Sequence, residues 1–170
     1  NAYNAGALSN RNIIINGAMQ VWQRGTSFSP TSTEVYTVDR FQSLIGSGFN
    51  GDATITQSSD VPTGQGFTYA TDIAIDSVQT PSAGQNGGFK QEIERQNVWQ
   101  LAYGTSNAKT VTLSFWVKSN KTGTYTVQFQ INADGGTGSY YLKEYTINSA
   151  DTWEKKTLTV PGNTVTAVST

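Results

Sequence analysis

The last third of the chain carries the pattern that most restricts its fold, a regular alternation of apolar and polar side chains. In residues 110–118 (TVTLSFWVK), an apolar side chain occupies every second position, and residues 124–131 repeat the pattern. A period of two places these side chains on one face of an extended strand. The predicted inward-facing side chains are Val111, Leu113, Phe115 and Val117 in the first segment, and Tyr125, Val127, Phe129 and Ile131 in the second. The pattern predicts antiparallel strands with one buried face.

Other segments have the same character and are separated by turn-forming residues. They are 140–147, 153–160 and, with weaker alternation, 35–45, 53–57 and 67–75. Residues 89–98 fit either one helical turn or a strand, and the preceding Gly-Gly pair favours a strand. No segment has the spacing of an amphipathic helix. We therefore predict an all-β fold, an antiparallel β-sandwich.

The organisation along the chain follows from where this pattern begins and ends. Residues 1–12 (NAYNAGALSNRN) are small and polar, which is typical of a linker or docking arm. Residues 13–170 are then one β-sandwich domain. After the last strand ends at Pro161-Gly162, the remaining residues show no complete strand pattern. We expect further strands beyond Thr170, so that the sandwich is incomplete in this sequence.

Composition excludes several classes of function. The chain has no Cys and no His, so thiol nucleophiles, thiolate zinc sites and the commonest general base are all missing. A net charge of −1 gives no electrostatic footprint for nucleic acid. The longest aliphatic run is Ile13-Ile14-Ile15, far short of the roughly 20 residues of a membrane span. We predict no cofactor, no nucleic-acid partner, no membrane span and no enzymatic activity.

Acidic residues are the remaining source of chemistry. Two pairs lie at even spacing: Glu92 with Glu94, and Asp72 with Asp76. Each pair would project from one face of a strand, and a solvated sheet face explains it better than acid–base catalysis. The loops at 50–52 and 134–136 offer oxygen ligands for calcium, but their Asp-Gly steps already form turns. No metal site is predicted.

Aromatic side chains outside the core pattern mark a candidate glycan-binding surface. The rings are Trp99, Tyr103, Trp116 and Tyr140, with Gln96, Asn97 and Gln100 as hydrogen-bonding partners. An exposed ring beside amides suits a sugar, whose apolar face stacks while its hydroxyls form hydrogen bonds. The same rings also suit a subunit interface, or packing against a loop, and these alternatives stay open.

The segment 11–28 (RNIIINGAMQVWQRGTSF) carries the residues assigned a structural role. Its Asn16-Gly17 pair predicts a short hairpin or a hooked segment. The Trp22 ring is expected to bury at the sandwich edge. Asp39 and Arg40 are expected within a strand. Because basic residues are few, an ion pair of Asp39 with Arg24 is the hypothesis for fixing this segment to the sheet.

These same segments resemble a module of bacteriophage fibre proteins, which are tail-fibre and virion structural proteins. The matching stretches are 12–17 (NIIING), 20–27 (QVWQRGTS), 36–41 (YTVDRF), 91–94 (QEIE), 111–119 (VTLSFWVKS), 152–154 (TWE) and 161–162 (PG). The resemblance covers roughly residues 11–163. It implies a jelly-roll sandwich similar to carbohydrate-binding modules, within an appendage of the extracellular virion. It also implies other virion proteins as partners, and strands that continue beyond the Pro-Gly step.

We therefore expect a non-enzymatic virion fibre domain, on tail or capsid, that displays or positions a module recognising the host surface. A homotrimer follows from the fibre resemblance and from surplus aromatic rings, with a bacterial surface polysaccharide as the ligand. The alternative is a secreted carbohydrate-binding module attached to a glycoside hydrolase. A depolymerase is disfavoured by the lack of His.

Overall fold

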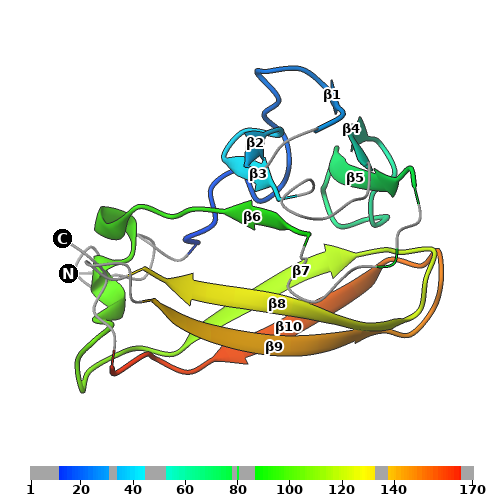
Figure 1. The fold of residues 1–170 in the computed structure, drawn as a ribbon. Helices are drawn as coiled ribbons and strands as arrows, with labels where there is room; N and C mark the ends of the chain where they lie inside the picture. The colour runs from blue at the N-terminus through cyan, green and yellow to red at the C-terminus, as the bar shows by residue number, and fades with distance from the viewer. Residues whose placement is uncertain are drawn as a thin grey trace. The chain divides into compact units, whose positions relative to one another are not determined.

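The fold is all-β. A computed structural model describes residues 12–30, 34–44, 53–77, 80, 87–132 and 138–165. Every strand pair within these residues is antiparallel. The helical elements among them are two 3₁₀ turns, η2 (Arg95–Asn97) and η3 (Trp99–Leu101). The prediction of an antiparallel, β-sandwich-like fold is confirmed (Figure 1).

The chain divides into two compact units, residues 1–93 and 94–170. Each is described by itself below. The sequence predicted one sandwich domain over 13–170, and the division into two units does not test that prediction. The arm predicted at 1–12 lies, apart from Asn12, outside the described residues, as do the loops 50–52 and 134–136.

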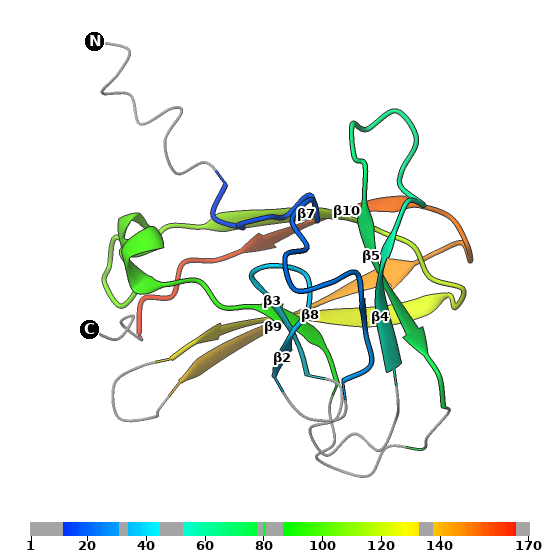
Figure 2. The same cartoon turned by 90° about the horizontal axis from the view of Figure 1, so that it is seen from above.

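The first unit contains two small sheets of short strands. One has the order β1-β4-β5 and the other β2-β3-β6. The strands are β1 (Ser27–Phe28), β2 (Val35–Tyr36), β3 (Phe41–Ser43), β4 (Ala53–Ser58), β5 (Ala70–Ile75) and β6 (Phe89–Gln91). The connection 59–69 projects beyond the ends of β4 and β5 (Figure 2). Only β4 and β5 are long enough to show the predicted alternation.

Two apolar clusters bury the inner faces of these sheets. Ile55 and Ala53 of β4 are buried, and Phe28 and Ile73 pack against them from the flanking strands. In the second sheet the rings of Phe41 and Phe89 stack with centroids 5.0 Å apart. Val38, Thr37 and Ser43 are fully buried beside them in sequence. The unit thus combines apolar contacts with buried polar side chains.

The second unit contains two long antiparallel pairs, β7–β10 and β8–β9, and the strands of the second pair follow each other in sequence. Its strands are β7 (Val111–Val117), β8 (Gly123–Ile131), β9 (Ser139–Ile147) and β10 (Glu154–Val160), the long arrows of Figure 1. Along β8, partly buried and exposed side chains alternate without interruption. The alternation predicted for residues 124–131 is therefore confirmed, and in residues 111–117 it holds from Val111 to Phe115, while Trp116 is partly buried.

Aromatic rings fill the interior between these strands. Phe115 of β7 meets Tyr145 of β9 edge-to-face at 5.1 Å, and Tyr145 stacks on Tyr125 of β8 at 5.7 Å. Burial, and secondarily the nearby Tyr125, raise the pKa of the Tyr145 hydroxyl. Leu158 and Ile147 are buried at the strand ends. Inward apolar positions on all four strands therefore supply the packing.

Two expectations about local structure were wrong. Residues 35–45 are not one strand, because a tight turn over 37–40 separates β2 from β3, and Arg40 has a left-handed backbone with φ 76°. Asp39 and Arg40 therefore lie in a turn. In residues 89–98, where a strand was favoured, β6 extends over Phe89–Gln91, and residues 95–97 form the 3₁₀ turn η2. The two-residue strand β1, which pairs with β4, was not among the predicted strands.

Candidate functional site

The seven predicted glycan-binding residues fall in three separate places of the second unit. Gln96, Asn97, Trp99 and Gln100 lie on η2 and η3 or next to them, and Tyr103 follows. Trp116 lies on β7 and Tyr140 on β9. Of the predicted site residues, those on or next to the 3₁₀ turns are neighbours, whereas Trp116 and Tyr140 lie on two separate strands.

The 3₁₀ turns present one indole ring to solvent. The Trp99 side chain is 72% exposed, and the Arg95 guanidinium lies over the ring, 5.4 Å from its centroid. Gln100 Nε2 donates to the Asn97 carbonyl at 2.9 Å, and Asn97 Nδ2 donates to Glu94 Oε2 at 3.1 Å. Both amides thus stabilise the turn, while Gln96 is exposed.

Tyr103 is held within the loop that follows these turns. It is partly buried, and burial raises the pKa of its hydroxyl. The loop closes through two backbone bonds, Lys109 N to the Leu101 carbonyl at 2.8 Å and Gly104 N to the Asn163 carbonyl at 2.7 Å. The Tyr103 ring is therefore less accessible than that of Trp99.

Trp116 takes the polar face of β7, as predicted, and is partly buried there. Lys155 of β10 lies directly opposite in the antiparallel register. Two residues along, the Lys118 ammonium group lies over the Trp153 ring, 5.7 Å from its centroid. The ring thus sits beside a long basic side chain, and no amide partner predicted for it is on β7 or β10.

Tyr140 belongs to a row of uncharged side chains on the exposed face of β8 and β9. Tyr140 lies opposite Gln130, and Leu142 lies opposite Gln128. Opposite residues of an antiparallel pair share a face. Tyr140 and Leu142 are each 62% exposed. We call Gln128, Gln130, Asn132, Tyr140 and Leu142 the β8–β9 strip.

The amides of this strip form a chain of hydrogen bonds. Gln128 Nε2 donates to Gln130 Oε1 at 3.4 Å, and Gln130 Nε2 donates to Asn132 Oδ1 at 2.7 Å. Sequence reasoning missed Gln128, Gln130 and Leu142 as partners of Tyr140. The signal was present, because the alternation already assigned Gln128 and Gln130 to the outward face of their strand.

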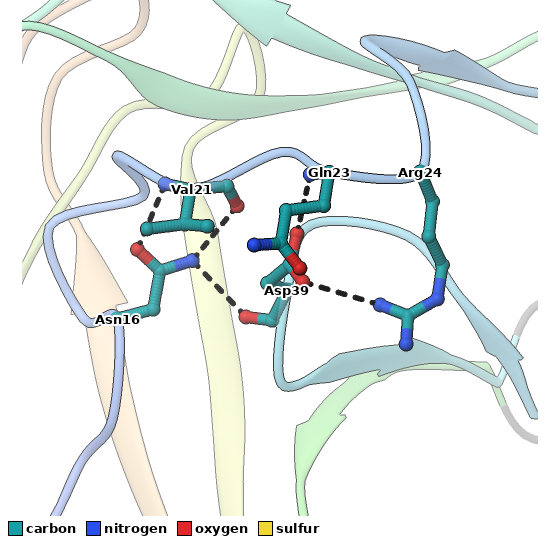
Figure 3. A network of polar contacts seen from close by, with 5 residues as sticks. All are labelled: Asn16, Val21, Gln23, Arg24 and Asp39. Carbon is teal, nitrogen blue, oxygen red and sulfur yellow. Dashed lines mark hydrogen bonds and ion pairs between the residues drawn. The ribbon is translucent and has the colours of Figure 1, made fainter.

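A second polar network lies in the first unit, and Figure 3 shows it from close by. Asn16 is its first centre. Its Nδ2 donates to the Val21 and Asp39 carbonyls, both at 3.0 Å. Its Oδ1 accepts from Gln20 N at 3.0 Å and from Val21 N at 3.1 Å. Asn16 itself has φ 55°, a left-handed conformation that Asn tolerates better than most residues. The hooked segment predicted at Asn16-Gly17 is thus present, closed by this side chain.

Asp39 is the second centre of the network. Its Oδ2 accepts from Gln23 N at 2.6 Å, and its Oδ1 lies 3.4 Å from Arg24 Nη1. Its backbone N donates to the Val21 carbonyl at 3.1 Å. The predicted Arg24–Asp39 ion pair is therefore present. We call Asn16, Val21, Gln23, Arg24 and Asp39 the N-terminal clasp.

Trp22 packs within the same segment. Its Nε1 donates to the Met19 carbonyl at 2.7 Å, and its ring stacks near Phe28 with centroids 6.4 Å apart. The Arg24 guanidinium also lies over the Tyr36 ring, 5.2 Å from its centroid. The polar and aromatic residues of 16–28 thus fasten the segment to β1 and to the β2–β3 turn.

At least one member of each acidic pair has a structural partner. Glu92 is 2.7 Å from Lys90 Nζ, which also contacts Glu34 at 2.9 Å. Burial lowers the pKa of Lys90, but the bonds to these two carboxylates outweigh it and raise that pKa. Asp76 accepts from Thr54 Oγ1 at 2.7 Å. In the part of the chain that the structure describes, no three acidic side chains gather to hold a metal ion. Nor does any helix within it have the length and hydropathy to span a membrane.

Comparisons of this chain with protein-family models, with curated proteins and with solved structures find no match.

Proposed function

We propose that this chain is a non-enzymatic structural domain of a bacteriophage virion fibre, on the tail or the capsid. In this proposal it has a jelly-roll fold similar to carbohydrate-binding modules, and it displays or positions a module that recognises the host surface. Its location is the extracellular virion, in contact with other virion proteins.

The N-terminal clasp is the observation that carries the proposal. The stretches 12–17, 20–27 and 36–41, which resemble fibre proteins, supply all of its residues: Asn16, Val21, Gln23, Arg24 and Asp39. Their contacts are hydrogen bonds to backbone and one ion pair, which fasten a segment and transform no substrate. A motif explained by fastening supports a structural module more than a catalytic one.

Electron microscopy of labelled virions tests the location. Gold-labelled antibodies against residues 1–170 should decorate an appendage on particles of the phage that encodes this sequence. Antibodies against a major capsid protein serve as the matched control for label specificity. Label absent from particles, with the protein found in a secreted fraction, would favour the alternative of a carbohydrate-binding module attached to a glycoside hydrolase.

A homotrimer is part of the proposal, because fibres of this kind close through heterologous contacts around a three-fold axis. Trp99 is an exposed ring that such contacts can use. Light scattering coupled to gel filtration should give the mass of three chains. A single-chain mass for the complete native polypeptide would contradict the trimer.

The absence of turnover is tested separately. Incubation with capsule polysaccharide of the host should release no new reducing ends, since the sequence contains neither His nor Cys, and Glu92 and Asp76 make structural contacts. A known polysaccharide depolymerase is the positive control. Release of reducing ends that is lost in Glu92→Gln or Asp76→Asn would point to a depolymerase instead.

A further inference from the structure

We propose that the β8–β9 strip is a binding site for an uncharged glycan, with Tyr140 as the stacking ring and Gln128 and Gln130 as hydrogen-bonding groups. This inference rests on the proposed function, because it assigns the glycan-binding surface of that domain to one strip. In this site the amides next to Tyr140 are Gln128 and Gln130, whereas the sequence pointed to Gln96, Asn97 and Gln100 of the 3₁₀ turns.

The strip is built on paired strands. Residues 123–131 and 139–147 pair without a break, so the positions of opposite side chains are set by the register. Tyr140 and Gln130 are one such opposite pair, and Leu142 and Gln128 are the next pair on the same face. Directly opposite Cβ atoms are about 4.5–5.5 Å apart in antiparallel sheets. An apolar side chain, first the Tyr140 ring and then Leu142, therefore stands beside a primary amide twice along the strip.

The amides retain capacity for a ligand. Each primary amide has two N–H donors and a carbonyl oxygen with two lone pairs. Among the residues that the structure describes, Gln128 has its 3.4 Å bond to Gln130, and Gln130 uses one donor and one acceptor. Both side chains are exposed. A sugar hydroxyl both donates and accepts hydrogen bonds, as an amide does. A ligand carboxylate can only accept and a ligand ammonium group can only donate, so each would use only half of what the amide offers.

Charge indicates which kind of glycan fits. The exposed positions facing the same way on β8 and β9 are Thr124, Thr126, Gln128, Gln130, Tyr140, Leu142, Glu144 and Thr146. Glu144 is the one charged side chain in this set, and it lies opposite Thr126, beyond Leu142. Lys143 is opposite Val127 and so has the other facing. A polymer rich in carboxylate or sulfate would find no cation in this set to pair with. A neutral polymer has no charge that needs such a partner.

The size of the apolar surface also favours a sugar over a protein partner. Tyr140 and Leu142 are the large exposed apolar side chains on these two strands. Stable protein interfaces bury about 800 Å² per partner around several apolar anchors. One ring and one leucyl side chain are too few for that, but they suffice for stacking a short stretch of glycan. Several weak sites on one particle would raise avidity by about 10²–10⁴.

Affinity electrophoresis of the whole chain tests the inference, using gels that contain dextran, laminarin or galactan as neutral probes. At least one probe should retard the chain. Tyr140→Ala should weaken this retardation about tenfold, since aromatic stacking is removed, and Gln130→Ala should weaken it less. Tyr140→Phe should retain binding, because the ring face remains. Trp99→Ala removes the exposed ring of the 3₁₀ turns, tests the competing site there, and should bind normally if the strip is the site. Ile75→Ala, which removes an exposed apolar side chain of β5, is the control and should also bind normally.

Three results would overturn the inference. They are no retardation by any of the three probes, unchanged retardation of Tyr140→Ala, and loss of binding in Trp99→Ala alone. Thermal melting of each variant should match the parent, because these side chains are exposed, and this separates lost binding from lost folding. A Tyr140→Ala variant with changed oligomeric mass and normal glycan binding would instead assign the strip to a second copy of the chain. Failure here leaves the electron-microscopy test of the proposed function intact.

Discussion

The two compact units hold their chains in different ways. In residues 94–170, the four strands have seven or nine residues, and the alternation between inward apolar and outward polar side chains is complete along β8. In residues 1–93, the strands have two to six residues. The connections there are fastened by side chains bonded to backbone, above all Asn16 and Asp39.

The difference shows where each unit gains its specificity. A long alternating strand has a defined register, because a slip by one residue would expose its whole apolar face. A strand of two or three residues has too few such positions, so other contacts must fix its place. We expect the second unit to be sensitive at inward apolar positions and the first to be sensitive at polar residues of its connections.

The largest effect is expected for Phe115→Ala in the second unit. The ring contacts Tyr145 edge-to-face and is partly buried. Truncating a buried Phe costs roughly 3–5 kcal/mol of unfolding free energy, and partial exposure places this site at about 3. Urea denaturation measures the loss. Ser114→Ala on the exposed face of the same strand is the control and should stay within about 0.5 kcal/mol. Equal effects of the two variants would contradict the assigned facing of β7.

The next effect is expected for Asn16→Ala in the first unit. This variant removes four hydrogen bonds and places Ala at φ 55°. The lost hydrogen bonds, which are partly exposed, and the strain of Ala in a left-handed backbone should together lower the free energy of unfolding by about 2–3 kcal/mol. Asn16→Gly keeps the backbone conformation accessible and separates the two causes, and Asn16→Asp keeps the acceptor alone. A loss below that of Ser114→Ala would show that polar fastening does not stabilise this unit.

A smaller effect is expected at the other centre of the clasp. Asp39→Ala removes the acceptor of Gln23 N and the partner of Arg24, which should cost about 1–2 kcal/mol. Arg24→Ala should cost no more than about 0.5 kcal/mol, because its side chain is 51% exposed. Asp39→Asn keeps an acceptor oxygen and should lie between them. If Asp39→Ala melts as the parent does, the clasp has no stabilising role.

The smallest effect is expected at acid pH and concerns a polar fastening in the second unit. Glu154 accepts from Asn148 N at 2.9 Å and Ser149 N at 2.8 Å, and it forms an ion pair with Lys156. The Lys156 hydrogen bond first, and then these backbone bonds, lower the pKa of Glu154 from 4.5 to about 2.

Because this pKa is lower in the folded chain than in the unfolded chain, the stabilisation is fully present above about pH 4.5 and is lost as pH falls toward 2. The melting temperature should therefore decline over this range. In Glu154→Gln the decline should be shallower, with a lower starting value near neutral pH. Parallel curves for parent and variant would show that Glu154 does not contribute to the acid dependence.

Much of the second unit could be predicted from sequence, because its contacts follow local periodicity. The segments predicted at 110–118, 124–131, 140–147 and 153–160 agree with the four strands to within one residue at each end. In the first unit, the scarcity of basic residues was enough to suggest the Arg24–Asp39 pair. The turn over 37–40 was missed because Val38 and Phe41 are apolar, as they would be in a strand. In the structure the chain bends between them and both side chains are still buried.

The candidate site shows where such prediction stops. The exposed ring of Tyr140 was identified from two adjacent tyrosines, one of which must face outward. Its partners were sought among Gln96, Asn97 and Gln100, which are close to another ring in sequence. The structure places Gln130 opposite Tyr140 instead.

By itself, then, the sequence determined which residues of the second unit's four strands are extended and which face of β8 is apolar, since both depend on neighbours one or two positions away. Only the tertiary structure decided which strand pairs with which, and in which register. Those choices depend on hydrogen bonds between segments far apart along the chain, and periodicity is the same for every register shifted by two. The same holds for Asn16, whose amide closes its turn on a carbonyl 23 residues later.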